Sequence, residues 1–215
     1  MTIVPGSGAD NGDVVLDGRY LIGRPLGTQP RTYDAHDDVL GRNVLVTVLG
    51  SSTADLECIR IAASLSHTSL TRVLDANLET VAETRFVVTE LPLGTSIAST
   101  PPQLSDVEVE QVRCQLQQLL THLHGHGIGH RFPTGATGVH IDRSVSDTAP
   151  RVSTLLDGVY LLPPDQLSSA RDQARIDDFA RLGSLLEDVG VSTSRRRRER
   201  RRTAGHHVAQ HRATA

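Results

Sequence analysis

The chain has 215 residues, which is enough for one sizeable domain and too few for two comfortable ones. All 22 basic residues are arginine, so phosphate chemistry that depends on a lysine ammonium is excluded. With three Phe, three Tyr and no Trp, stacking on nucleic acid bases has little to work with. Residues 1–194 carry 14 Arg and 24 acidic residues, a net charge of −10, whereas residues 195–215 carry a net charge of +7.

The two cysteines, Cys58 and Cys114, form neither a disulfide framework nor the spacing of a zinc site, which favours a reducing compartment. No stretch approaches the roughly 18 consecutive apolar residues that a membrane span requires. The first residues also lack the apolar region of a signal peptide. We therefore expect a cytoplasmic protein without a transmembrane segment.

The first half of the chain is predicted to be a sheet with one helix. Residues 1–13 contain Pro5, three Gly and no periodicity, which indicates a flexible leader. Short apolar runs rich in β-branched residues follow in "VVLDGRYLIGRPLG", "RNVLVTVLG", "LTRVLDANLE" and "TRFVVTEL", as in antiparallel strands. Among them, residues 53–64 have the apolar spacing of a helix.

The second half changes period. From Leu104 to His124 the apolar residues recur every three or four positions, Ser105 and Glu108 form a capping box, and Gly125 ends the predicted helix. Strand-like pieces follow in "GVHI", "RVSTLL" and "VYLL", and a last helix is predicted to begin at Ile176. Beyond Gly190 the composition is dominated by Ser, Arg and His.

Six stretches, in the expected order, resemble the serine/threonine protein kinases of actinobacteria. "LDGRYLIGRPLG" is similar to the first strand and the start of the glycine-rich loop, and "YDAHDDVLGRNVLVTVL" to the second and third strands. "LSHTSLTRVLD" resembles the segment after the C helix, and "RFVVTELPLGTSI" the fifth strand and hinge. "HLHGHGIGHR" resembles the end of the E helix and the start of the catalytic loop, and "IDDFARLGSLL" the start of the F helix.

This resemblance implies an α+β, protein kinase-like two-lobe fold over residues 14–190. A β-rich N-lobe with one helix would cover about residues 14–93, and a shortened, mainly helical C-lobe about residues 94–190. Residues 191–215 would form a disordered Arg/His-rich tail. The activation segment would be almost absent, since "YLLPPDQ" resembles its end, and the chain stops soon after the F helix.

In the N-lobe the resemblance places degenerate residues where kinases hold the phosphates. The glycine-rich loop keeps Gly27 alone and contains Pro30, which has no N–H to offer. The phosphate-binding lysine of the third strand falls on Thr47, and its glutamate partner falls on Cys58. Glu57 is one residue away, about 100° round a helix, so no ion pair is expected.

The catalytic loop is degenerate too. The base aspartate falls on Phe132, the phosphate-contacting lysine on Thr134, and the metal-binding asparagine on Thr137. For the second metal ligand two alignments stay open. In one, Leu156-Asp157-Gly158 replaces Asp-Phe-Gly; in the other, "LLDGVYLL" is the preceding hairpin and Pro163 holds the place. Only a one-residue slip would put Asp157 in the position of the ligand.

Three residues match the structural motifs of the family. His130 and Arg131 brace the catalytic loop in kinases, and Asp178 corresponds to the aspartate that organises the lower lobe. A metal site among His122, His124, His126 and His130 is not expected, because glycines interrupt the helix and no Cys, Asp or Glu lies among them.

The expected function is therefore that of a pseudokinase: a protein-binding scaffold or regulator in bacterial signalling, related to the cell envelope, without catalysis or cofactor. The alternative is an atypical kinase or nucleotide transferase that binds ATP with Mg²⁺ or Mn²⁺ through Gly27 and Asp157. The third interpretation is that the chain is a fragment losing its function, whose lower lobe exposes apolar surface.

The "xxDDxxxLG" pattern also resembles the pseudokinase part of mycobacterial lipid-flippase proteins, in which a phosphothreonine recruits a forkhead-associated domain. A signalling kinase or a forkhead-associated domain protein is accordingly an expected partner.

The basic segment "RRRRERRR" is a candidate for binding a further partner. Its arginines would bind an anionic membrane surface, nucleic acid or the acidic body of the chain, or would remain solvated. They are Arg195, Arg196, Arg197, Arg198, Arg200, Arg201 and Arg202.

Overall fold

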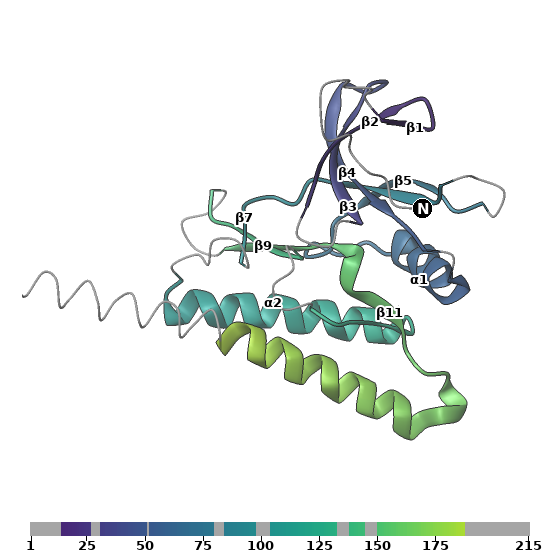
Figure 1. Cartoon of the computed structure of the whole chain (residues 1–215). Helices are drawn as coiled ribbons and strands as arrows, with labels where there is room; N and C mark the ends of the chain where they lie inside the picture. Colours follow the sequence, from purple (N-terminus) through teal and green to yellow (C-terminus); the bar gives the residue numbers. More distant parts are fainter. Residues whose placement is uncertain are drawn as a thin grey trace, which may run out of the picture.

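A curled antiparallel sheet of six strands forms the upper part of the molecule, which we describe from a computed structural model (Figure 1). The described residues are 14–26, 31–50, 52–79, 84–97, 104–132, 138–144 and 150–187. The strand order is β1-β2-β3-β4-β6-β5. The strands are β1 (Val15–Leu16), β2 (Tyr20–Pro25), β3 (Thr32–Asp37), β4 (Arg42–Val48), β5 (Val73–Asn77) and β6 (Phe86–Glu90).

Alternation along these strands gives the sheet two different faces. One face buries an aromatic and aliphatic cluster in which Tyr20 meets Phe86 edge to face, at 5.8 Å between ring centroids. At one edge of the cluster the buried Asp37 carboxylate accepts hydrogen bonds from Arg19 at 2.7 and 2.8 Å and from Arg42 at 3.3 Å. The Arg19 guanidinium lowers the pKa of Asp37, so this network stabilises the sheet with the carboxylate charged.

Two helices agree with their sequence patterns. The first, α1 (Thr53–Ser64), has the predicted bounds, and α2 (Asp106–Gly125) begins after the Ser105 cap. The capping box is present: Glu108 N–H donates to Ser105 Oγ at 3.3 Å, and Ser105 N–H donates to Glu108 Oε2 at 2.7 Å. These bonds satisfy donors that the first turn of a helix otherwise leaves without partners.

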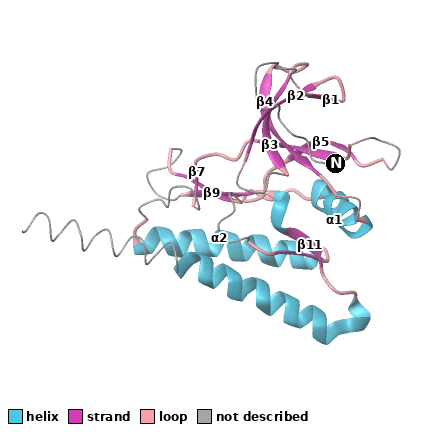
Figure 2. Ribbon diagram, viewed as in Figure 1, coloured by secondary structure: helices cyan, strands magenta, loops and turns pink. Residues whose placement is uncertain are grey.

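Two small sheets connect the upper sheet with the helices (Figure 2). One joins β7 (Thr95–Ser96), β9 (Val139–Asp142) and β10 (Arg151–Thr154), and the other pairs β8 (Ile128–His130) with β11 (Val159–Leu161). Because β10 and β11 pair with different strands, the reading of "LLDGVYLL" as one hairpin is wrong. A 3₁₀ turn at Leu156–Gly158 separates the two strands instead.

The last helix begins earlier than Ile176: it covers residues 168–187 of the described chain and runs beside α2 (Figure 1). Its first two turns are polar, "SSARDQAR", so no apolar period announced them. They are held by local ion pairs instead, between Arg171 and Asp165 and between Arg175 and Asp172, on residues that favour helices.

A single large core joins the three helices to the second face of the sheet. In this core α1 contributes Cys58, Ile59 and Ala62 and packs on β11 and β8, while a leucine-rich face of α2 lies beside the apolar face of the last helix (Figure 1). The leucines of this interface, all nearly inaccessible, are Leu116, Leu119, Leu120, Leu123, Leu182 and Leu186. The α+β class is confirmed, whereas the protein kinase-like two-lobe fold stays a prediction.

Candidate functional site

Asp178 lies at the centre of a buried polar network under the strand β8. Its side chain is 0% exposed. Oδ2 accepts hydrogen bonds from the His130 backbone N–H at 3.2 Å and from His124 Nε2 at 3.0 Å, while Oδ1 accepts one from the Tyr160 hydroxyl at 2.9 Å. Burial raises the pKa of Tyr160, so the phenol stays a donor to Asp178. The end of α2, the strand β8 and the strand β11 are thereby fixed to one carboxylate of the last helix.

His130 is the second fixed point and is also fully buried. Its Nε2–H donates to the Leu155 carbonyl oxygen at 3.0 Å, and its Nδ1 accepts from the Phe132 N–H at 3.0 Å. The neutral imidazole with its proton on Nε2 satisfies both bonds. Burial lowers the pKa of His130 to about 4, because a charged ring would be poorly solvated there. The histidine therefore braces the segment before the 3₁₀ turn as a neutral group.

Two glycines make this close packing possible. A Cβ at Gly129 would collide with Asp178 Oδ2 and would lie 2.7 Å from the Tyr160 ring. A Cβ at Gly158 would lie 2.5 Å from His130 Cε1. Both contacts are shorter than van der Waals packing allows, so any side chain here would push the network apart.

Phe132 and Arg131 follow His130 but point into different surroundings. Phe132 is 1% exposed, has a positive φ of 42°, and places its ring 4.4 Å from the His130 ring in the main core. Arg131 is exposed and lies 4.8 Å from the centroid of the Tyr160 ring. Phe132, which the resemblance places at the catalytic base, is thus a buried apolar ring without an ionisable group.

Thr47 and Cys58, on which the resemblance places the lysine and the glutamate of kinases, carry no charge. Thr47 Oγ1 lies 3.0 Å from Thr32 Oγ1 on the facing strand, so the two hydroxyls share a hydrogen bond. Cys58 is buried in the core, and Glu57 is 54% exposed and pairs with Arg60 at 3.7 Å.

Several residues singled out from the sequence lie outside the described residues. They are Gly27, Thr134, Thr137 and the tail arginines from Arg195 to Arg202. Asp157 belongs to the 3₁₀ turn at Leu156–Gly158, although its side chain is not among those described. The predictions for these residues stay predictions.

His122, His124, His126 and His130, which the sequence analysis considered as a metal site, do not converge on one point among the described residues. His124 binds Asp178, His130 binds Leu155, and His126 Nδ1 lies 2.9 Å from the His122 carbonyl oxygen. Across the part of the chain that the structure describes, no group of three or more His, Cys, Asp or Glu side chains is arranged to hold a metal ion.

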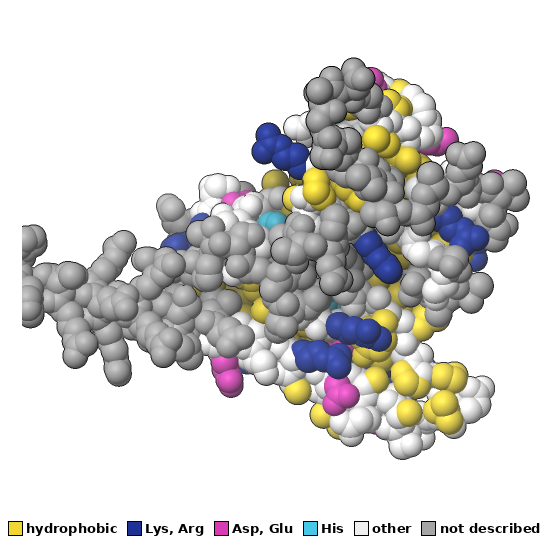
Figure 3. Space-filling view, viewed as in Figure 1, with side chains coloured by type: hydrophobic (Ala, Val, Ile, Leu, Met, Phe, Trp, Pro, Cys, Tyr) yellow, Lys and Arg dark blue, Asp and Glu magenta, His cyan; other side chains and the backbone are white. Residues whose placement is uncertain are grey.

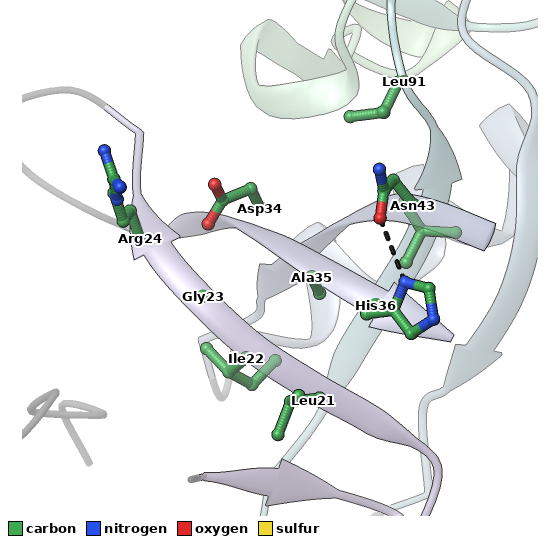
Figure 4. A pocket seen from close by; sticks show the side chains of 10 residues that line it. Leu21, Ile22, Gly23, Arg24, Asp34, Ala35, His36, Asn43 and Leu91 are labelled. Carbon is green, nitrogen blue, oxygen red and sulfur yellow. Dashed lines mark hydrogen bonds between the residues drawn. The ribbon is translucent and has the colours of Figure 1, made fainter. Parts of the chain in front are cut away.

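A cavity of about 520 Å³ lies on the face of the sheet that also carries Thr32 and Thr47. It is lined by Leu21, Ile22, Gly23, Arg24, Asp34, Ala35, His36, Asn43, Val44 and Leu91. His36 Nδ1 lies 3.0 Å from Asn43 Oδ1, and this pair forms one side of the cavity (Figure 4). Asp34 and Arg24 stand on neighbouring strands across from Leu91 (Figure 4).

The sequence reasoning missed this cavity, although a signal existed. In "TYDAHD" the polar residues Thr32, Asp34 and His36 alternate with residues that face the opposite, apolar cluster. Such a period of two in a central strand indicates one polar face. Because the neighbouring strand adds Asn43 and Thr47 to that face, it could have been read as a candidate binding surface.

A second groove, of about 530 Å³, lies on the segment that leaves β6. Leu91 and Leu93 line it and are 40% and 55% exposed. On the opposite side, the Gln115 side chain donates to the Pro150 carbonyl oxygen at 2.8 Å and accepts from the Val152 N–H at 3.2 Å, completing one edge of β10. The groove therefore combines exposed leucines with a fixed polar wall.

Comparison with protein-family models finds no match for the chain, and comparison with curated proteins finds none either. None of the described helices has both the length and the apolar character that crossing a membrane requires.

Proposed function

We propose that the chain is a catalytically inactive, protein kinase-like domain that acts as a protein-binding scaffold or regulator in bacterial signalling. The proposal rests on a contrast between residues that stabilise the fold and residues at the expected catalytic positions. The buried contacts of His130 and Asp178 hold the segment expected to be a catalytic loop, while Thr47, Cys58 and Phe132 supply no charge where phosphoryl transfer would need one.

The physical argument concerns positioning and charge. Phosphoryl transfer relies on cations and metal ligands that neutralise phosphate oxygens and on a group that orients the attacking hydroxyl. A threonine pair at 3.0 Å and a buried phenylalanine ring offer neither. Retaining the brace without the reacting groups is the pattern expected when a fold is kept for its surface.

Two features support binding of a protein partner. The groove beside Leu91 and Leu93 presents exposed leucines next to polar groups, which is the composition of many interaction surfaces. Hydrophobic side chains also gather on the surface near the start of the helix 168–187 (Figure 3), where Leu167 is 56% exposed.

The first test is thermal unfolding with and without millimolar ATP plus Mg²⁺ or Mn²⁺, with an ATP-binding kinase as the positive control. A ligand present at 100 times its Kd stabilises a folded protein by about 2.7 kcal/mol, which is easily measured. We expect no shift and no transfer of labelled phosphate. A metal-dependent shift that disappears in Asp157→Ala would overturn the proposal and favour the atypical ATP-binding enzyme.

The second test concerns the scaffold role. A photoreactive residue placed at Leu93 in cells should cross-link one defined protein, and Leu93→Asp should abolish its association. Val39→Asp is the matched control, because Val39 is 69% exposed in the turn between β3 and β4, away from the groove. Equal loss of association in both variants, or none in either, would contradict a partner bound at this groove.

A further inference from the structure

The cavity on the sheet contains two opposite charges, Asp34 and Arg24, for which no partner lies among the described residues. Asp34 accepts no hydrogen bond from the described residues, and Arg24 forms no ion pair with them, although both line the same cavity. Both residues are exposed, and an ion pair between exposed side chains would contribute little to stability, so their separation costs the fold little. Here the two side chains stand apart in a space large enough for a small molecule.

Local backbone geometry brings both residues to the same cavity. Between Ile22, which pairs with Ala35, and Pro25, which pairs with Tyr33, strand β2 has two residues opposite one. This bulge puts Gly23 and Arg24 opposite Asp34, and a bulge redirects side chains that strict alternation would send to opposite faces. Arg24 consequently lines the cavity next to Asp34.

Gly23 fixes the position of the carboxylate. A Cβ at residue 23 would collide with Asp34 Oδ1 and would lie 3.1 Å from its Cγ, so the carboxylate rests directly on the glycine backbone. The rest of the cavity adds an amide and apolar groups. With Asn43 Oδ1 facing His36, the Asn43 amide N–H groups are left for another acceptor, and Leu21 and Leu91 supply apolar wall.

We propose that this cavity binds a small zwitterion, an α-amino acid with an apolar side chain. Its ammonium group binds Asp34, its carboxylate binds Arg24 with help from the Asn43 amide, and its side chain packs against Leu91. The volume of about 520 Å³ falls within the range of about 300–1,000 Å³ typical of small-molecule sites. A nucleotide is disfavoured, because its phosphates would meet the Asp34 carboxylate.

The cavity residues alone carry this proposal, which goes beyond the scaffold function and does not depend on it. Binding is measured by calorimetry or saturation-transfer NMR on the full chain with L-leucine as the probe. Two analogues each remove one charge: N-acetyl-L-leucine lacks the ammonium, and L-leucinamide lacks the carboxylate. We expect each analogue to bind at least about tenfold more weakly than leucine, since charge-assisted hydrogen bonds in a site are strong.

Two variants then assign each charge to its partner. Asp34→Asn should bind leucine about tenfold more weakly and should no longer prefer it to N-acetyl-L-leucine, whereas Arg24→Gln should no longer prefer it to L-leucinamide. Asp38→Asn and Arg31→Gln are matched controls, being exposed and outside the cavity, and should bind as the parent chain does. Thermal unfolding of all four variants verifies that they fold.

The proposal is overturned if leucine does not bind at millimolar concentration, if either analogue binds as tightly as leucine, or if the cavity variants behave as the controls do. These titrations contain no ATP. Failure here therefore leaves the scaffold proposal untouched, and ATP binding in the earlier test leaves this one untouched.

Discussion

The molecule places an aspartate against a glycine in two regions, with opposite results. Asp178 is buried, packs on Gly129 and accepts hydrogen bonds from the His130 N–H, His124 and Tyr160. Asp34 packs on Gly23 at the surface and accepts none from the described residues. In both regions a glycine leaves space for a neighbouring carboxylate. Where groups of the protein donate hydrogen bonds to that carboxylate, the arrangement stabilises the fold. Where none of the described residues donates to it, the carboxylate is available to a ligand.

The largest expected effect comes from replacing the buried carboxylate. In Asp178→Asn the negative charge disappears, so the His130 N–H, His124 and Tyr160 lose charge-assisted hydrogen bonds, and an NH₂ group takes the place of one accepting oxygen. We expect a loss of about 3 kcal/mol in the free energy of unfolding. Urea denaturation measures it, and a loss below about 1 kcal/mol would contradict the central role given to this carboxylate.

A methyl group at Gly129 tests the same region by shape alone. Because a Cβ would collide with Asp178 Oδ2 and would lie 2.7 Å from the Tyr160 ring, Gly129→Ala must move either the strand β8 or the last helix. We expect a loss of about 2 kcal/mol. Gly125→Ala is the matched control, since nothing lies within 4 Å of a Cβ at residue 125, and it should leave unfolding nearly unchanged.

Acid should weaken the same region through His130. Its pKa is about 4 in the folded protein and near 6.5 in an unfolded chain, so the unfolded state binds more protons between these values. Stability is therefore fully present above pH 6.5 and declines as pH falls toward 4. From pH 7.5 to 5.5 we expect this group to remove about 1.4 kcal/mol.

Denaturation at the two pH values, compared between the parent chain and His130→Gln, isolates this contribution. Burial also lowers the pKa of His67 and of His140, so the parent chain should lose more than one histidine accounts for, and the variant should retain the remainder. An unchanged pH dependence in His130→Gln would show that His130 does not titrate as its burial requires.

Periodicity predicted most of the fold because its strongest elements have a polar side and an apolar side. The helix α1 matched its predicted bounds, and α2 was predicted from its leucines and its capping box. The first turns of the last helix were missed because ion pairs, rather than an apolar stripe, hold them. The short strand β8 was missed because "IGH" owes its strand conformation to β11, thirty residues away.

The two candidate sites differ in how much of each could be predicted from the sequence. Asp178 and His130 were identified through the resemblance, but their contacts with His124, Tyr160 and Leu155 arise from tertiary packing that no local pattern encodes. The cavity depends on a bulge in β2 that sets Arg24 beside Asp34. Residue spacing predicts neither the bulge nor the close approach of Asp34 to Gly23, because both depend on how β2 and β3 pair in the folded protein.

A smaller effect is expected at the hydroxyl pair of Thr32 and Thr47 on strands β3 and β4. Thr47→Val removes the bond of 3.0 Å to Thr32, whose hydroxyl is left in a nearly buried position, and should cost about 1 kcal/mol in urea denaturation. Because we assign Thr47 no role in nucleotide binding, the thermal response to ATP should be identical in parent and variant. A response that changes with this substitution would contradict the inactive assignment.

The smallest effect on folding should come from Asp34→Asn, which is the same chemical change as Asp178→Asn in the other region. With no hydrogen bond from the described residues to lose, it should alter the free energy of unfolding by less than about 0.5 kcal/mol. Asp34→Asn could instead destabilise the fold as much as Asp178→Asn does. That result would show that Asp34 and the adjacent Gly23 stabilise the fold, and it would contradict their assignment to a ligand site. If stability is unchanged while leucine binding is lost, the same pair, an aspartate on a glycine, serves folding at one place and recognition at the other.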